Sequence, residues 1–202
     1  MPGKIFITLC LCIISYFMGC FNAAYFYSSK LKNMDIRQYG SGNAGTTNVL
    51  RVFGAKAALL VFLVDALKGF LAVRMAMYFA GGIPAAQVLC ALCVVAGHNW
   101  PLFLKFRGGK GVATSIGIAF ALNWATTLIA LGVGVIIIAI WRMVSLGAVI
   151  GLGISPFVFW LGGSSGQSVL VMTFLAAMSL WQHRGNIRRI LRGEENKLGQ
   201  KK

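Results

Sequence analysis

Acidic residues are scarce in this chain of 202 residues. Four are present (Asp35, Asp65, Glu194 and Glu195) against nineteen lysines and arginines, so the formal net charge is +15. A magnesium site built from carboxylates needs clustered acids, and no cluster lies within or beside an apolar segment. The sequence therefore predicts no bound metal and no other cofactor. Phosphate groups would have to be neutralised by basic side chains and backbone amides.

Catalytic nucleophiles and acid–base pairs are also few. Neither histidine, His98 or His183, has an acid nearby in sequence to complete a triad, and the positions five residues on are Phe103 and Arg188. The H-x4-D signature of the common glycerolipid acyltransferases is therefore absent. The cysteines all lie in apolar helical sequence, which predicts buried, unreactive thiols even at the redox spacing of the last two. They are Cys10, Cys12, Cys20, Cys90 and Cys93.

Apolar residues dominate what is present. The chain is 58% hydrophobic and 11% charged, with a mean hydropathy of +0.78. These values predict an all-α polytopic membrane protein, and the length suits one domain over residues 1–202. The positive charge then suggests anionic lipid headgroups and phosphorylated substrates as partners, and not nucleic acid. No cleavable signal peptide is expected, because the first apolar segment is too long for a signal core.

About seven membrane-spanning helices are predicted from the apolar segments. The segments at 85–97 and 111–122 are short for a bilayer core of about 30 Å. We therefore expect the loop between them to lie below the membrane surface, in a cavity lined by protein. The predicted spans are residues 5–27, 57–80, 85–97, 111–122, 125–141, 146–161 and 168–181.

Basic residues concentrate in alternate loops and in the C-terminal tail. The turns at 81–84, at Asn123 and at 162–167 have no lysine or arginine. By the positive-inside rule the N-terminus lies outside and the C-terminus in the cytoplasm. This topology predicts that the polar segments 41–51, 98–110 and 183–186, together with Ser145, share the cytoplasmic face.

The segment from His98 to Thr114 contains polar and basic residues between apolar segments. It combines His98 and Asn99 with three cations (Lys105, Arg107 and Lys110) and with three glycines. Gly108, Gly109 and Gly111 permit close backbone approach to a ligand and an anion-binding nest at the start of a helix. It is not a Walker P-loop, since Gly111 follows the lysine where Ser or Thr is required. A plain basic loop between two membrane helices is the alternative.

A second polar cluster spans residues 40–51 and predicts a turn that leads into a short helix. Its small and polar side chains can cap that helix or bind a ligand, and their number favours a ligand site. They are Ser41, Gly42, Asn43, Thr46, Thr47 and Asn48, followed by Arg51. Asp65 and Lys68 share one face of the next predicted helix, and they are open to a structural and to a functional interpretation.

Three segments resemble the signature blocks of the PlsY family, the bacterial acyl-phosphate:glycerol-3-phosphate acyltransferases. They are GSGNAGTTNVLR at 40–51, GHNWPLFLKFRGGKGVAT at 97–114 and HRGNIRRILRGEE at 183–195. The resemblance covers essentially the whole chain. One departure occurs after Ser145 and Leu146, where Ala148 replaces the second serine of the family's usual Ser-Leu-x-Ser.

The resemblance implies acyl transfer from acyl phosphate to the 1-hydroxyl of glycerol 3-phosphate, at the cytoplasmic face of the bacterial plasma membrane. The candidate catalytic residues are Ser41, His183 and Asn186. The candidate substrate-binding residues are Gly42, Asn43, Thr46, Thr47, Asn48, Arg51, Lys68, His98, Asn99, Lys105, Gly108, Gly109, Lys110, Gly111, Ser145 and Glu195.

The general base is the least determined element of the predicted site. His183 is the obvious candidate, but Arg184, Arg188 and Arg189 crowd it with positive charge, which weakens a base. We therefore expect His183 and Asn186 to position the glycerol while a substrate phosphate accepts the proton. An anion transporter is the alternative function. A metal-dependent phosphatidyl transferase is disfavoured by the missing acids.

Overall fold

The computed structural model describes residues 2–81 and 83–200. Over these residues the regular elements are all helical, as predicted, and no strand occurs among them. The chain divides after Leu122 into two compact units, which we call the N-terminal unit (Met1–Leu122) and the C-terminal unit (Asn123–Lys202). Each unit is described by itself.

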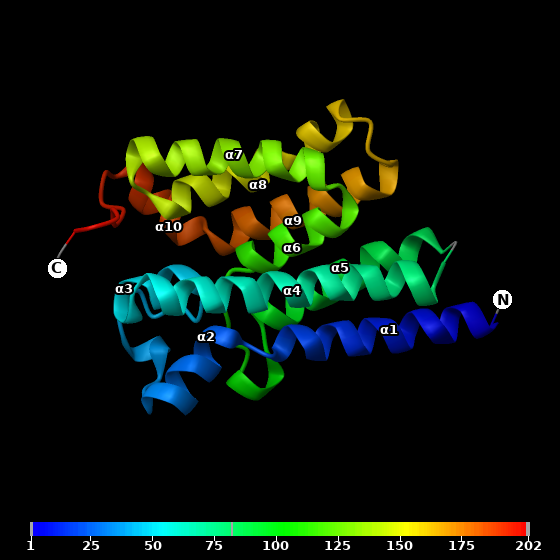
Figure 1. The fold of residues 1–202 in the computed structure, drawn as a ribbon, viewed down its shortest axis with the longest axis horizontal. Helices are drawn as coiled ribbons and strands as arrows, with labels where there is room; N and C mark the ends of the chain where they lie inside the picture. Colours follow the sequence, from blue (N-terminus) through cyan, green and yellow to red (C-terminus); the bar gives the residue numbers. More distant parts are fainter. Residues whose placement is uncertain (1, 82, 201–202) are drawn as a thin grey trace. The chain divides into compact units, whose positions relative to one another are not determined.

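The N-terminal unit is built on three long helices and one shorter one (Figure 1). Helix α5 packs against α1, and α6 packs against α4. The small helices α2 and α3 lie at the end of the unit where α1 finishes (Figure 1). The elements are α1 (Pro2–Cys20), α2 (Ala23–Phe26), a π-helical turn (Tyr27–Leu31), a 3-10 turn (Ile36–Gln38), α3 (Thr46–Phe53), α4 (Ala55–Phe79), α5 (Pro84–Asn99), a second 3-10 turn (Leu102–Leu104) and α6 (Val112–Leu122).

Glycines bring these helices into backbone contact. A Cβ on Gly19 of α1 or on Gly97 of α5 would overlap the backbone of the facing helix. The same holds for Gly69 of α4 and Gly117 of α6. Between apolar helices there is little hydrophobic driving force in lipid, so close packing at small residues supplies much of the attraction. The two glycine pairs thus fix the helix pairs that carry the polar loops.

The C-terminal unit consists of α7 (Trp124–Trp141), α8 (Val144–Leu161), α9 (Gly166–Gln182) and α10 (Arg184–Leu191). Helix α8 packs against both α7 and α9. The tail after α10 returns to the link between α7 and α8. There the Leu198 amide donates to the Arg142 carbonyl at 2.7 Å, and the Arg142 guanidinium donates to the Leu198 carbonyl at 2.6 Å.

Four described segments are long and apolar enough to cross a membrane: Gly3–Leu31, Pro84–Leu104, Trp124–Trp141 and Val144–Leu161. Each of the seven predicted spans coincides with a helix, but three of these helices are too short or carry too many charges to count as membrane spans by length and composition. Helix α4 carries several charges, α6 has 11 residues and α9 has 17. The number of spans and their orientation therefore stay predictions.

Most helix boundaries differ from the predicted ones by one or two residues, and three differences change the place of a polar residue or break a span. Tertiary contacts account for the first of these three. The span expected over 5–27 breaks at Phe21, whose carbonyl accepts a hydrogen bond from Lys68 Nζ at 2.7 Å, and Asn22 caps the new helix α2. Helix α5 continues through Asn99 and so includes His98, where a loop was expected. Ser145 lies in the first turn of α8 and not in a loop.

Candidate active site

The glycine-rich loop closes onto the end of α5. The Gly108 amide donates to the Asn99 carbonyl and the Gly109 amide to the His98 carbonyl, each at 3.1 Å. These bonds satisfy carbonyls that a helix C-terminus otherwise leaves without partners. Because the two amides are used within the loop, an anion bound there would be met by the backbone after Gly109.

Gly109 lies where the polar segments 40–51 and 98–114 contact each other. A Cβ at this position would overlap Nε2 of His98 and would lie 2.8 Å from the Ala44 carbonyl oxygen. The same carbonyl accepts a hydrogen bond from Asn22 Nδ2 at 3.0 Å. The loop at 108–111 and the turn at 43–45 therefore lie against each other. The sequence had predicted only that both segments lie at the same face of the membrane.

Two helices begin next to this junction. Helix α3 starts at Thr46 after Gly45, which offers no side-chain cap, and α6 starts at Val112 after Gly111, whose φ is +77°. The first amides of a helix have no helical acceptor, and they form its positive end. Two short helices thus supply backbone donors of the kind that bind phosphate.

Several of the buried polar atoms that have no partner in the described chain lie in this region, and the others are in Ser15, Asp65 and Thr114. Among the described residues, Thr46 Oγ1 and both amide atoms of Asn99 are buried and make no hydrogen bond. Asn99 is only 2% exposed. Buried polar groups in native proteins are almost always satisfied, so these atoms indicate a ligand or ordered water at the junction.

Asn48 was a candidate substrate ligand, but its side chain makes hydrogen bonds within the protein. Its side chain accepts from the Ser41 amide at 2.8 Å and donates to the carbonyls of Ile36 and Tyr39 at 3.1 and 2.9 Å. It is 1% exposed. These contacts make Asn48 the residue that shapes the turn, including the left-handed Gly42 at φ +72°.

The other predicted ligands of the N-terminal unit are more accessible. Ser41, Gly42, Arg51 and Lys105 are exposed. Asn43, Thr46, Thr47, Gly108 and Lys110 are half-buried, and Gly109 and Gly111 are buried.

Asp65 and Lys68 form a buried ion pair next to His98. Lys68 Nζ lies 2.7 Å from Asp65 Oδ1 and 2.9 Å from His98 Nδ1, and the Asp65 and His98 atoms are 3.5 Å apart. The Asp65 contact is an ionic one, because neither carboxylate oxygen makes a well-directed hydrogen bond to any described residue. Lys68 also donates to the carbonyls of Gly19 and Phe21 at 3.1 and 2.7 Å.

Glu195 organises the polar groups of the C-terminal unit. Its carboxylate accepts from Ser145 Oγ at 2.9 Å, from Asn186 Nδ2 at 2.8 Å and from Arg189 Nε at 2.8 Å. Glu195 is 4% exposed. A carboxylate with these three protein donors is suited to hold Ser145 and Asn186 in place.

His183 lies at the junction of α9 and α10, where its orientation is fixed. Its Nδ1 lies 2.8 Å from the Ser179 carbonyl. A carbonyl oxygen only accepts, so Nδ1 carries a proton, and in the neutral ring Nε2 is then the basic nitrogen. The side chain is 3% exposed. This tautomer allows Nε2 to accept a hydrogen bond or a proton from a hydroxyl group.

Arg37 was missed by the sequence analysis. It forms a bidentate pair with Asp35, and its Nη1 donates to the Leu104 carbonyl at 3.1 Å, which anchors the loop after α5. The hydrogen bonds from Arg37 lower the pKa of Asp35 below its usual value. The D-x-R spacing was the available signal. The Asn22–Ala44 bond, also missed, has no comparable signal.

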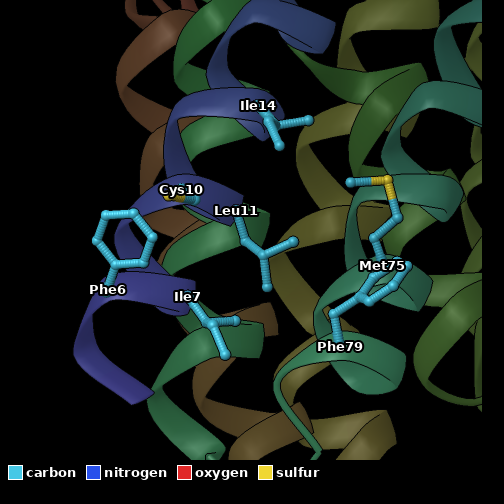
Figure 2. A pocket seen from close by; sticks show the side chains of 7 residues that line it. All are labelled: Phe6, Ile7, Cys10, Leu11, Ile14, Met75 and Phe79. Carbon is cyan, nitrogen blue, oxygen red and sulfur yellow. The ribbon is translucent and has the colours of Figure 1, made fainter. Parts of the chain in front are cut away.

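Two further features concern possible metal ligands and an apolar groove. No group of three His, Cys, Asp or Glu side chains able to hold a metal occurs in the described part of the chain. A groove of about 290 Å³ lies between α1 and α4, and its lining is entirely apolar (Figure 2). It is lined by Phe6, Ile7, Cys10, Leu11, Ile14, Met75 and Phe79.

Comparison with known proteins identifies the family of this chain. The Glycerol-3-phosphate acyltransferase family profile matches residues 9–193. The chain is 48% identical over 192 residues to the glycerol-3-phosphate acyltransferase of Thermoanaerobacter sp. strain X514, covering 94% of each chain. It is 44% identical over 203 residues to that of Clostridioides difficile strain 630, covering 98% of this chain and 99% of the relative.

A solved structure extends the likeness to the fold. The crystal structure of PlsY, an integral membrane glycerol 3-phosphate acyltransferase, in its glycerol 3-phosphate form has a TM-score of 0.89 and 34% identity, covering 95% of this chain and 96% of that one. The lysophosphatidic acid form gives a TM-score of 0.87 at the same identity. The chain is therefore a multi-pass membrane protein of the PlsY-type glycerol-3-phosphate acyltransferase family, which serves phospholipid biosynthesis.

Proposed function

We propose that this chain transfers a fatty acyl group from acyl phosphate to the 1-hydroxyl of glycerol 3-phosphate. The products are 1-acyl-glycerol 3-phosphate (lysophosphatidic acid) and inorganic phosphate. The observation that carries the proposal is the junction at Gly109. Two polar segments meet there beside the N-termini of α3 and α6, with Thr46 Oγ1 and the Asn99 amide buried and without partners in the described chain. Both substrates carry the phosphate that such a junction binds.

The reaction exchanges one carbon–oxygen bond for another. The C1 hydroxyl oxygen of glycerol 3-phosphate attacks the acyl carbonyl carbon, and the bond from that carbon to the phosphate oxygen breaks. The electron pair leaves with phosphate, and the hydroxyl proton moves to a phosphate oxygen of a substrate. Because acyl phosphate has a good leaving group, catalysis rests mainly on positioning and on electrostatic stabilisation.

The proposal assigns roles to individual residues by their chemistry. Arg51, in the last turn of α3, and Lys110, which precedes α6, neutralise substrate phosphates. In the C-terminal unit Asn186 and His183 hold the attacking hydroxyl, and Glu195 supports Asn186. The reaction needs no metal in this scheme, since cations and amides balance the phosphate charge.

The cellular setting follows from the sequence. The distribution of Lys and Arg supports an active site at the cytoplasmic face of the bacterial plasma membrane. The partners there are acyl phosphate, glycerol 3-phosphate and membrane lipids. Since the family profile spans residues 9–193 and so includes most of both units, we assign the activity to the whole chain as a single functional domain.

A donor comparison tests the proposal. Purified protein in lipid vesicles is given glycerol 3-phosphate with either acyl phosphate or acyl-CoA, and lysophosphatidic acid and phosphate are measured. We expect both products with acyl phosphate and neither with acyl-CoA, and a loss of several tens-fold or more in Lys110→Ala. Transfer from acyl-CoA alone would contradict the donor assignment. Protein-dependent flux of glycerol 3-phosphate into sealed vesicles without acylation would favour the transporter alternative.

A further inference from the structure

Lys68 is a buried cation with several protein contacts, and the sequence had left it open as a substrate ligand or as a structural partner of Asp65. Its ammonium has three protons, and three acceptors surround it: the carbonyls of Gly19 and Phe21 and Nδ1 of His98. Asp65 at 2.7 Å balances its charge. The Lys68 side chain is only 7% exposed. With every donor used inside the protein, little remains for a substrate phosphate.

The contact with His98 determines the proton positions on that ring. An ammonium group has no lone pair and can only donate. At 2.9 Å from Lys68, Nδ1 of His98 must therefore be the acceptor, so it carries no proton. The neutral imidazole then has its proton on Nε2. The carboxylate of Asp65 and the two carbonyls keep Lys68 in its charged form, because an ammonium is their natural partner.

The Nε2–H group points at the glycine-rich loop. A Cβ on Gly109 would overlap Nε2, so a residue without a Cβ is needed at this position to admit the ring. Among the described residues Nε2 has no hydrogen-bond partner, although the His98 side chain is only 4% exposed. Thr46 Oγ1 and the Asn99 amide, which are fully buried and make no hydrogen bond to a described residue, belong to the segments on either side of it. An Nε2–H group beside the glycine-rich loop is therefore placed to donate to an acceptor on a ligand.

We propose that Lys68 is a positioning residue that locks His98 as a neutral Nε2–H donor, and that His98 gives this hydrogen bond to a phosphate oxygen of a substrate. The inference rests on the proposed function for the identity of that substrate. It assigns the two histidines opposite tautomers and opposite tasks. His98 donates through Nε2, whereas His183, protonated on Nδ1 by its bond to the Ser179 carbonyl, accepts through Nε2.

The tautomer can be measured without any activity assay. The chain has two histidines, so protein labelled with nitrogen-15 histidine gives two imidazole spectra, and His98→Gln assigns them. At neutral pH we expect His98 to show a protonated Nε2 and an unprotonated Nδ1. A proton on Nδ1, or on both nitrogens, would overturn the proposal. Its failure would leave the acyl-transfer function untouched.

Two variants of His98 separate donation from simple packing. A glutamine places its amide near the Nε2 position and can still donate to the substrate, whereas an asparagine reaches only the Nδ1 position. We expect His98→Asn to lose about 10- to 100-fold in kcat/KM, as for a lost hydrogen bond to a charged group, and His98→Gln to retain several times more. Equal losses would overturn the assignment. A rise confined to the KM of one substrate identifies whether acyl phosphate or glycerol 3-phosphate supplies the oxygen.

A paired variant tests whether Lys68 only neutralises Asp65. Lys68→Met alone leaves a buried carboxylate unpaired and is expected to fold poorly. Asp65→Asn with Lys68→Met removes both charges at nearly constant volume, so folding should recover. If Lys68 acts through His98, kcat/KM stays reduced by about tenfold or more in this double variant, and the His98 spectrum shows mixed tautomers. Full recovery of activity with an unchanged tautomer would refute the positioning role.

Discussion

Replacing Gly109 with alanine should damage the site more than the fold. The added Cβ would overlap Nε2 of His98 and lie 2.8 Å from the Ala44 carbonyl oxygen, where ordinary contacts begin near 3.4 Å. Neither neighbour moves freely, because Lys68 holds the imidazole and Asn22 holds the carbonyl. The loop itself must therefore shift by at least about 0.6 Å.

The size of the effect follows from that shift. A displacement approaching 1 Å can cost about 100-fold in rate, and overpacking costs about 1–3 kcal/mol of stability. We expect kcat/KM to fall by about 10- to 100-fold in purified Gly109→Ala assayed with acyl phosphate and glycerol 3-phosphate, with thermal unfolding only modestly lowered.

A matched control is available in α8. Gly153 is helical and has nothing within 4 Å of its added Cβ, so Gly153→Ala should leave both activity and folding near the wild-type level. Near-normal kinetics in a folded Gly109→Ala protein would refute the packing of the loop against His98 and Ala44.

Three further predictions concern the C-terminal unit and the charge balance. Glu195→Gln keeps the shape of the side chain but replaces one acceptor oxygen with an amide donor, so the side chain can no longer accept from all three of its present donors. We expect a loss of about 1–3 kcal/mol in stability together with reduced activity. Unchanged thermal unfolding would argue against the organising role of Glu195. His183→Gln can position a hydroxyl but cannot act as a base. It should retain about a tenth or more of the wild-type turnover, whereas a fall of about 10³-fold at saturating substrate would make His183 the general base. Activity should persist in EDTA, and a loss that magnesium restores would show that the phosphate charge is balanced differently.

The sequence predicted the helices well because apolar length and glycine punctuation are local properties. It also predicted the glycine-rich loop and the turn before α3 as polar sites, since such residues are costly inside a membrane protein without a purpose. The break in α1 was not predicted, because the helix ends there through long-range bonds from Lys68 to backbone carbonyls. No local pattern reports a partner 47 residues away.

The roles of individual polar side chains were harder to predict for the same reason. Asn48 was expected to bind substrate, yet its amide joins three backbone groups of the preceding turn. Lys68 was a candidate substrate ligand whose pairing with Asp65 was equally open to a structural interpretation, and it lies among protein acceptors. Residue type gives the hydrogen-bonding capacity of a side chain, but only the tertiary fold determines which partners use that capacity.

An isotope experiment tests the proposed reaction most directly. Glycerol 3-phosphate labelled with oxygen-18 in its C1 hydroxyl is incubated with acyl phosphate and the protein in lipid vesicles, and the products are analysed by mass spectrometry. Attack on the acyl carbon predicts that all of the label is retained in the ester of lysophosphatidic acid and that the released phosphate is unlabelled. Label in a glycerol bisphosphate, accompanied by free fatty acid, would show attack on phosphorus and contradict acyl transfer.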